Sequence, residues 1–234
     1  MRIDDPVAVA RQYATETNLE ARRSLYANAE GPDPREIAFD AVAEIAPKRV
    51  IEVGGGPGEL AARIGSELGC EVVMLDISPR MVELARERGV DARVGDVQSL
   101  PFPDGAFDCA LAAWMLFHVA DLDAGLRELA RVLRPGGRLV ATTNAAGHLK
   151  ELREIAGTAA WPQVFTRENG AETIGRHFDR VERRDADGWI TIDDDEVVLG
   201  FVASLDAETP PVLPPFELPI RSRRASSVFV ATKT

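Results

Sequence analysis

The chain has 234 residues, 45% of them hydrophobic, and a formal net charge of −11, so it can bury one sizeable core but lacks the clustered basic residues of a broad nucleic-acid-binding face. No run approaches the roughly 20 apolar residues that cross a bilayer, and residues 1–6 lack the apolar centre of a signal peptide. The two cysteines, Cys70 and Cys109, fall in apparent core segments, which argues against a disulfide framework or a zinc site. Together with the net charge and the lack of a long apolar run, this favours a cytosolic protein with no membrane or nucleic-acid partner.

The first two thirds of the chain carry the regular patterns. Residues 1–45 are predicted to form helices joined by a turn at Gly31-Pro32-Asp33-Pro34. From residue 46 to residue 143, strand and helix patterns alternate, which predicts a parallel sheet with helices on both faces. Five strands are predicted in this region, at residues 49–53, 71–76, 91–94, 107–113 and 138–143.

The rest of the chain is less regular. Helices are predicted at residues 147–158 and 167–176, and a strand is predicted to begin at Val181. Asp193 is expected to cap a further helix. Residues 227–232 are predicted to end the chain as a buried strand.

The end of the first predicted strand is the most informative segment, and it reads VIEVGGGPG from residue 50 to residue 58. Gly54, Gly56 and Gly58 allow the backbone to bend sharply and to approach a ligand where any Cβ would clash. The N–H groups of the following helix would face that ligand with a partial positive charge. This turn predicts a cofactor with a ribose and an acidic end, but it does not distinguish between such cofactors.

Acidic residues lie at the ends of the first three predicted strands. Glu52 closes the first strand, Asp76 closes the second, and Asp96 follows the third. Ligands of open α/β sheets bind outside the carboxyl ends of the strands. There, Asp76 could accept hydrogen bonds from both ribose hydroxyls, and Asp96 could reach the amine of an adenine. Together with the glycine turn, these residues predict a site for a nucleoside-bearing cofactor.

Four motifs in a fixed order make the chain resemble class I S-adenosylmethionine-dependent methyltransferases, of the bacterial type 11 kind. The motifs are EVGGGPG, LDISPRMVELAR, GDVQSLPFPDGAFD and HVADLDAGLRELARVLRPGGRLV, and they cover about residues 48–143. The resemblance implies a Rossmann-like, seven-stranded, mostly parallel sheet with helices on both faces and helical cap elements. It also implies that residues 227–232 form an antiparallel last strand. We expect one domain over residues 1–234, with a core at 40–145 and 226–232, and acceptor-side cap elements at 1–30 and 146–225.

The resemblance also implies roles for individual residues around S-adenosyl-L-methionine. The glycine turn would pass under the methionine part, Asp76 would hold the ribose, and Asp96 would bind the adenine amine. Because Asp76 ends a strand, its replacement is expected to change stability little. The full set of cofactor-binding residues implied in this way is Glu52, Gly54, Gly55, Gly56, Gly58, Asp76, Ile77, Met81, Asp96, Val97 and Ala113.

A small-molecule methyl acceptor is expected, with its accepting atom and the oligomeric state left open. Transfer from a sulfonium is an in-line displacement, so the protein mainly orients the reactants and removes water. His148 is the candidate general base, whereas His118 is interpreted as a structural hydrogen bonder. Residues expected to line an acceptor pocket are Tyr13, Trp114, His148 and Trp161. No metal is expected.

Three alternatives remain at this stage. An RNA-modifying methyltransferase would share the core. A nicotinamide-dependent oxidoreductase would share the glycine turn and Asp76, but it would not explain Gly95-Asp96-Val97 or the RPGG passage. A cofactor-sensing protein without turnover would keep the cofactor site alone.

Overall fold

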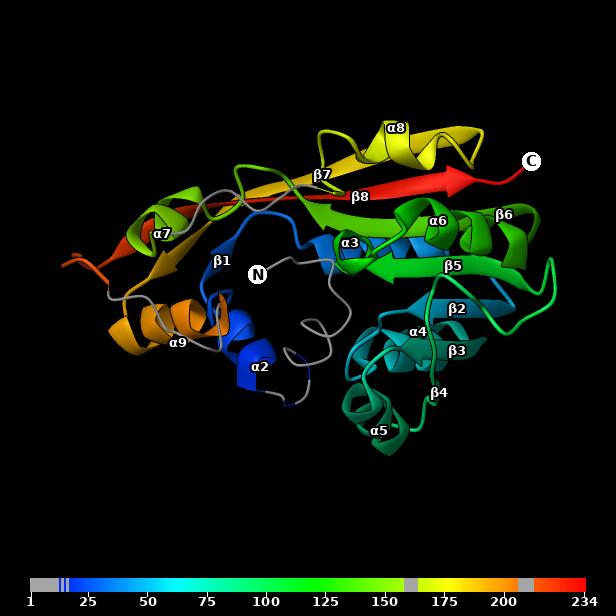
Figure 1. Cartoon of the computed structure of the whole chain (residues 1–234), viewed down its shortest axis with the longest axis horizontal. Helices are drawn as coiled ribbons and strands as arrows, with labels where there is room; N and C mark the ends of the chain where they lie inside the picture. The colour runs from blue at the N-terminus through cyan, green and yellow to red at the C-terminus, as the bar shows by residue number, and fades with distance from the viewer. Residues whose placement is uncertain (1–12, 14, 16, 158–163, 206–212) are drawn as a thin grey trace.

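The computed structural model describes residues 13, 15, 17–157, 164–205 and 213–234, and Trp161 therefore lies outside the described residues. The described chain forms one mixed sheet in the order β1-β7-β8-β6-β5-β2-β3-β4 (Figure 1). Its strands are β1 (Ala29–Glu30), β2 (Arg49–Val53), β3 (Glu71–Asp76), β4 (Asp91–Val94), β5 (Phe107–Ala113), β6 (Leu133–Asn144), β7 (Arg180–Ile192) and β8 (Ile220–Thr232).

The parallel half of the sheet follows the sequence pattern closely. Strands β4, β3, β2, β5 and β6 pair in parallel, and the first four have the predicted bounds. Only β6 begins earlier than predicted, at Leu133, because the strand continues through Pro135-Gly136-Gly137 with a register irregularity opposite β5. Strand β8 pairs antiparallel to β6, as expected, although it is longer than the predicted segment.

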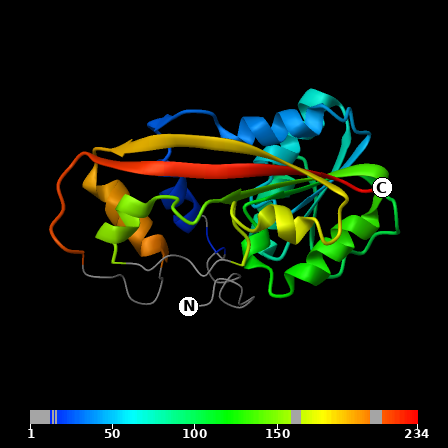
Figure 2. The ribbon, with the colours of Figure 1, turned by 90° about the horizontal axis from the view of Figure 1, so that it is seen from above.

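Helices cover both faces of this half (Figure 2). On one face, α3 (Pro34–Ala43) and α4 (Glu59–Leu68) bring Phe39 and Ile64 against Val50 of β2. Beside them, α5 (Pro79–Glu87) packs on Met74 of β3. On the opposite face, α6 (Leu122–Val132) and α8 (Gly170–Ile174) cover the alternate side chains of the same strands. The parallel strands are therefore buried on both faces, which explains their continuous apolar runs.

The described sheet has the implied Rossmann-like order and one short strand more than the seven that the resemblance implied. Strands β7 and β8 extend beyond the other strands, and β1 adds an eighth, two-residue strand along the edge of β7. No hydrophobic alternation marks so short a segment. The extended half of the β7–β8 pair carries α2 (Thr17–Ser24), α7 (Lys150–Ile155) and α9 (Asp195–Leu205), as Figures 1 and 2 show. These elements share a second hydrophobic core, formed by residues such as Leu25, Leu152, Ile190 and Phe201.

Close backbone approach holds β1 in place. An ideal Cβ at Gly188 of β7 would lie 1.9 Å from the carbonyl oxygen of Glu30. Gly31 has a φ of +91°, and its Cβ would lie 2.6 Å from the Asp187 carbonyl oxygen. Only glycine fits at these two contacting positions. The pairing of β1 places α2 and the start of α3 over the carboxyl end of the sheet.

We expect Gly188→Val to detach β1 from β7. A side chain cannot share the space of the Glu30 carbonyl, so unfolding free energy should fall by at least about 1–3 kcal/mol, and amide exchange at residues 29 and 30 should accelerate. Thermal denaturation and hydrogen exchange measure these effects. Gly65→Ala is the matched control, because a Cβ at Gly65 meets only ordinary contacts at 3.6 Å. Unchanged protection of β1 in Gly188→Val would contradict this account.

Within the described residues, no helix is long and apolar enough to span a membrane.

Candidate active site

A cavity of about 460 Å³ lies at the carboxyl ends of β2, β3, β4 and β5, where an open α/β sheet binds its ligand. The glycine turn after β2 forms its floor, and residues following β3, β4 and β5 form its sides. The residues of the cofactor prediction that line it are Glu52, Gly54, Gly55, Gly56, Asp76, Ile77, Asp96, Val97 and Ala113. The structure therefore places nine of the eleven predicted cofactor-binding residues around one cavity.

The three spaced glycines have different roles. Gly54 has a φ of +63°, and a Cβ there would lie 2.6 Å from Cβ of Met115. Gly56 has a φ of +58° with open space where its Cβ would be, so a side chain would extend into that space. Gly58 does not line the cavity; its Cβ would meet Cβ of Ala85 at 2.6 Å. Gly58 lets α4 pack closely on α5, so the role predicted for it beneath a ligand has no support here.

The Asp76 carboxylate joins two backbone segments. Its Oδ2 accepts the Gly56 N–H at 2.9 Å, and its Oδ1 accepts the Ser78 N–H at 2.8 Å. The side chain is 8% exposed, and burial raises the pKa of Asp76 above its ordinary value. Each oxygen keeps a lone pair for a ligand hydroxyl. Because Asp76 ties the glycine turn to the start of α5, the expectation that its replacement leaves stability unchanged has to be revised.

Glu52 lies beneath the glycine turn and is 2% exposed. Burial, with a smaller contribution from the nearby Asp76 carboxylate, raises the pKa of Glu52 to about 8. Among the described residues, its Oε2 has no hydrogen-bond partner. A buried carboxyl oxygen without a hydrogen-bond partner is costly. A ligand that brings a cation or an N–H donor to this oxygen would remove that cost.

Asp96 is held by Gln98, a residue that the sequence analysis missed. The Gln98 backbone N–H donates to Oδ1 of Asp96 at 2.9 Å, and the Gln98 side-chain Nε2 donates to Oδ2 of Asp96 at 2.8 Å. Gln98 also lines the cavity, and its Oε1 accepts the Asp121 N–H. The role of Gln98 could have been predicted from its position two residues after Asp96, because a side chain there can fold back on the turn that contains Asp96. Met81, by contrast, is 1% exposed and does not line the cavity, so direct ligand contact by Met81 lacks support.

A second cavity, of about 500 Å³, adjoins the first and is roofed by the cap elements. Both cavities are lined by Tyr13, Trp114 and His118. Trp114 has a φ of +53°, a strained conformation for a bulky residue. Its N–H donates to the Thr142 carbonyl, and its indole N–H donates to Oδ1 of Asn144 at 3.1 Å. The strained turn therefore holds Trp114 at the junction of the two cavities.

Comparison with known proteins agrees with this architecture. The model of a family described as a methyltransferase domain matches residues 51–141. The chain is 43% identical to demethylmenaquinone methyltransferase of Thermus thermophilus over 113 residues, which cover 45% of this chain and 51% of that protein. Residues 51–141 therefore match a class I S-adenosylmethionine-dependent methyltransferase domain. This finding favours S-adenosylmethionine over the nicotinamide cofactor that the sequence left open.

Two further matches limit what can be concluded about the activity of the whole chain. Malonyl-(acyl-carrier protein) O-methyltransferase of Serratia marcescens is 37% identical over 119 residues, covering 50% of this chain and 44% of that protein. The chain thus spans about half the length of the curated relatives it matches. The solved (4+2)-cyclase SpnF has a TM-score of 0.63 at 22% identity, over 96% of this chain and 94% of that chain. That likeness shows the fold alone, and chemistry has to be argued from the site.

The cofactor cavity of the methyltransferase domain suits S-adenosylmethionine. The unsatisfied Oε2 of Glu52 fits the ammonium group of the methionine part, and the open space at Gly56 lets a ligand approach the turn. The Asp76 carboxylate retains acceptor capacity for ribose hydroxyls. These three observations are independent of the family match.

His148 lies in the second cavity, at the start of the segment that leads to α7. Its Nδ1 accepts the Ala225 N–H at 3.0 Å, so the ring proton is on Nε2, which lies 2.9 Å from the Tyr26 hydroxyl oxygen. The Ala225 carbonyl oxygen, 3.2 Å from Nδ1, already accepts the Ala145 N–H. Burial, reinforced by nearby arginines, lowers the pKa of His148 to about 3. The hydrogen bonds favour a positioning role over that of a general base.

We therefore expect His148→Asn to lower turnover by less than about tenfold, whereas loss of a general base costs roughly 10²–10⁴-fold. A neutral His148 across the assay range should also contribute no limb near pH 6.5 to the pH–rate profile. Steady-state kinetics from pH 5 to pH 9 tests both points. His177→Asn is the control, since His177 pairs with Asp123 away from both cavities. A loss beyond a hundredfold with intact cofactor affinity would restore the base role.

Proposed function

We propose that this chain transfers the methyl group of S-adenosylmethionine directly to a small-molecule acceptor that binds in the second cavity. The observation that carries the proposal is the junction of the two cavities at Tyr13, Trp114 and His118. A reactive group in one cavity and an acceptor atom in the other would meet there. When bound, S-adenosylmethionine supplies an electrophilic methyl group on a sulfonium.

The chain's own residues bind and orient the reactants. We propose that Glu52 holds the ammonium group, Asp76 the ribose and Asp96 the adenine amine, with Gln98 fixing the Asp96 carboxylate. Trp114 and Tyr13 would exclude water at the junction and align the acceptor atom. The Tyr13 hydroxyl oxygen and His118 Nε2 lie 3.2 Å apart at the junction, and we propose that the rate comes from proximity and desolvation rather than from a general base. An acceptor that is already nucleophilic suits such a site.

The acceptor is selected by the cap. The family match ends at residue 141, whereas α2, α7 and α9 line the second cavity. The relatives are named for a quinone precursor and for a malonyl carrier protein, and the RNA-modifying alternative receives no support from them. We propose a small-molecule acceptor, one domain over the whole chain and a cytosolic location; these remain proposals, as does the absence of a nucleic-acid partner.

Turnover assays decide between an enzyme and a protein that only binds the cofactor. Purified chain, S-adenosylmethionine and a panel of small hydroxylated, quinol and amine compounds should yield S-adenosylhomocysteine only when an acceptor is present. Gly56→Val is the control, because its side chain would extend into the open space of the cofactor cavity. Calorimetry that found micromolar NAD binding and no S-adenosylmethionine binding would overturn the proposal.

A further inference from the structure

The second cavity carries a positive field in a protein whose net charge is −11. Five arginines line it: Arg22, Arg23, Arg35, Arg153 and Arg224. Among the described residues, the two carboxylates that line it are both exposed and engaged. Glu59 forms ion pairs with Arg23 and Arg88, and Asp33 caps α3. In this part of the chain, neither carboxylate forms an ion pair with Arg224.

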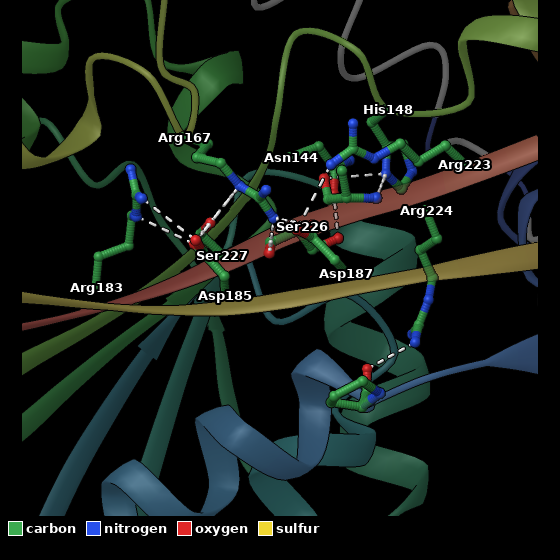
Figure 3. Close-up of polar contacts among 12 residues, drawn as sticks. Asn144, His148, Arg167, Arg183, Asp185, Asp187, Arg223, Arg224, Ser226 and Ser227 are labelled. Atoms are coloured by element: carbon green, nitrogen blue, oxygen red, sulfur yellow. Dashed lines mark hydrogen bonds and ion pairs between the residues drawn. The ribbon is translucent and has the colours of Figure 1, made fainter.

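Arg224 is the deepest of these charges. It is 4% exposed, and its Nη2 donates to the backbone carbonyls of Glu30 and Pro32, at 3.0 and 2.6 Å. Its Nε has no acceptor, and in the part of the chain that the structure describes no carboxylate forms an ion pair with it. Burying an uncompensated guanidinium costs several kcal/mol. Figure 3 shows that the neighbouring Arg223 points the other way, along β8 toward Asp187.

Two neutral groups on the same wall also present donors. Because Nε2–H of His148 donates to the Tyr26 oxygen, the Tyr26 proton points away from His148 and is available in the cavity. Burial raises the pKa of Tyr26 to about 12, so this proton is retained. Oδ1 of Asn144 accepts from Trp114 and Ser226, which leaves its Nδ2 without a partner among the described residues.

We infer that the acceptor carries an oxyanion, a carboxylate or a phosphate, that binds against Arg224, Tyr26 and Asn144. This inference rests on the proposed function and names the class of substrate. An anion there would compensate the buried guanidinium and accept the two neutral donors with charge-assisted hydrogen bonds. The apolar lining from Leu25, Phe117, Leu149, Phe165 and Phe201 would hold the body of the molecule. The anion orients the acceptor so that its reacting atom faces Trp114.

Matched probes test the sign of the charge. Binding of phenylacetate, phenyl phosphate, neutral phenylacetamide and cationic phenethylamine is measured by calorimetry or ligand-observed NMR on the protein saturated with S-adenosylhomocysteine. We expect at least one anion to bind tenfold or more tightly than the amide, with no binding of the ammonium probe. The comparison of phenylacetate with phenyl phosphate shows which oxyanion the site prefers. Equal or tighter binding of the neutral or cationic probe would overturn the inference.

Variants locate the anion. Arg224→Met should abolish the preference for the anion, whereas Arg223→Met, which removes the same charge from the adjacent residue, should keep it. Tyr26→Phe retains the ring and should weaken binding of the anionic probe two- to tenfold. This variant tests the site even if Arg224→Met fails to fold. A preference that survives both Arg224→Met and Tyr26→Phe would refute the site. Failure of S-adenosylhomocysteine to bind would instead count against the proposed function.

Discussion

Replacement of Asp76 by alanine is expected to raise the dissociation constant of S-adenosylmethionine by about 30- to 1,000-fold, or about 2–4 kcal/mol. Two ribose hydroxyls would lose their shared acceptor. The glycine turn would also loosen, because the Asp76 carboxylate accepts the Gly56 and Ser78 N–H groups. The unfolding free energy of the ligand-free protein should therefore fall too, by about 1–3 kcal/mol. Calorimetry and denaturant titration measure the two effects.

Asp91→Ala provides the matched control for this substitution. Asp91 lies on the adjacent strand β4, where its exposed carboxylate pairs with Arg93. A surface ion pair of this kind contributes little, so neither affinity nor stability should change by more than about 1 kcal/mol. A dissociation constant that Asp76→Ala leaves unaltered would remove Asp76 from the cofactor site.

Glu52→Gln is expected to abolish a pH dependence of stability. The folded protein holds the Glu52 proton up to about pH 8, whereas an unfolded glutamate releases it near its ordinary pKa of 4.5. The native state thus binds the additional proton between these values, and wild-type stability falls as pH rises. The difference between wild type and Glu52→Gln should change by about 1.4 kcal/mol per pH unit between about pH 5 and pH 8, roughly 4 kcal/mol in total, and level off above pH 8.

Denaturant titrations at each pH measure this difference directly. Glu71→Gln is the control, because it makes the same substitution at an exposed glutamate on the adjacent strand β3, where Glu71 is paired with Arg49. S-adenosylhomocysteine, whose ammonium group is proposed to lie at Glu52, should favour the carboxylate and reduce the slope. Parallel pH profiles for wild type and Glu52→Gln would show that Glu52 ionises normally and would contradict its buried, proton-bound state.

The parallel half of the sheet and its cofactor cavity could be predicted from local patterns. Strand β2, the glycine turn and α4 are consecutive in the chain. The spacing of Glu52, Gly54 and Gly56 therefore predicts both the sharp turn after β2 and the presence of a carboxyl group beside it. Asp76 and Asp96 end neighbouring parallel strands, so their convergence follows from the sheet topology. For Gly58, spacing cannot tell a glycine needed by a ligand from one needed by a packed helix, and the structure shows the close contact of Gly58 with Ala85 of α5.

The acceptor side depended on contacts between distant residues. His148 was singled out by its place after β6, but its role follows from Ala225 and Tyr26, which are 77 and 122 residues away in sequence. Strand β1 could not be predicted, because two residues carry no periodicity and their pairing requires the close approach at Gly188. Arg224 was not singled out from the sequence, because its burial depends on contacts with the carbonyls of Glu30 and Pro32, far away in the chain.

The sequence by itself determined the α/β class and the methyltransferase resemblance, and it predicted the residues at the carboxyl ends of the parallel strands, because each depends on short, contiguous motifs whose geometry is local. Only the tertiary structure decided that the cap encloses a second cavity, that His148 is neutral and bound to Tyr26, and that Arg224 is buried with no carboxylate paired to it among the described residues. Burial and charge compensation are properties of the surroundings that the fold assembles from distant segments. A linear pattern of residue types does not contain them.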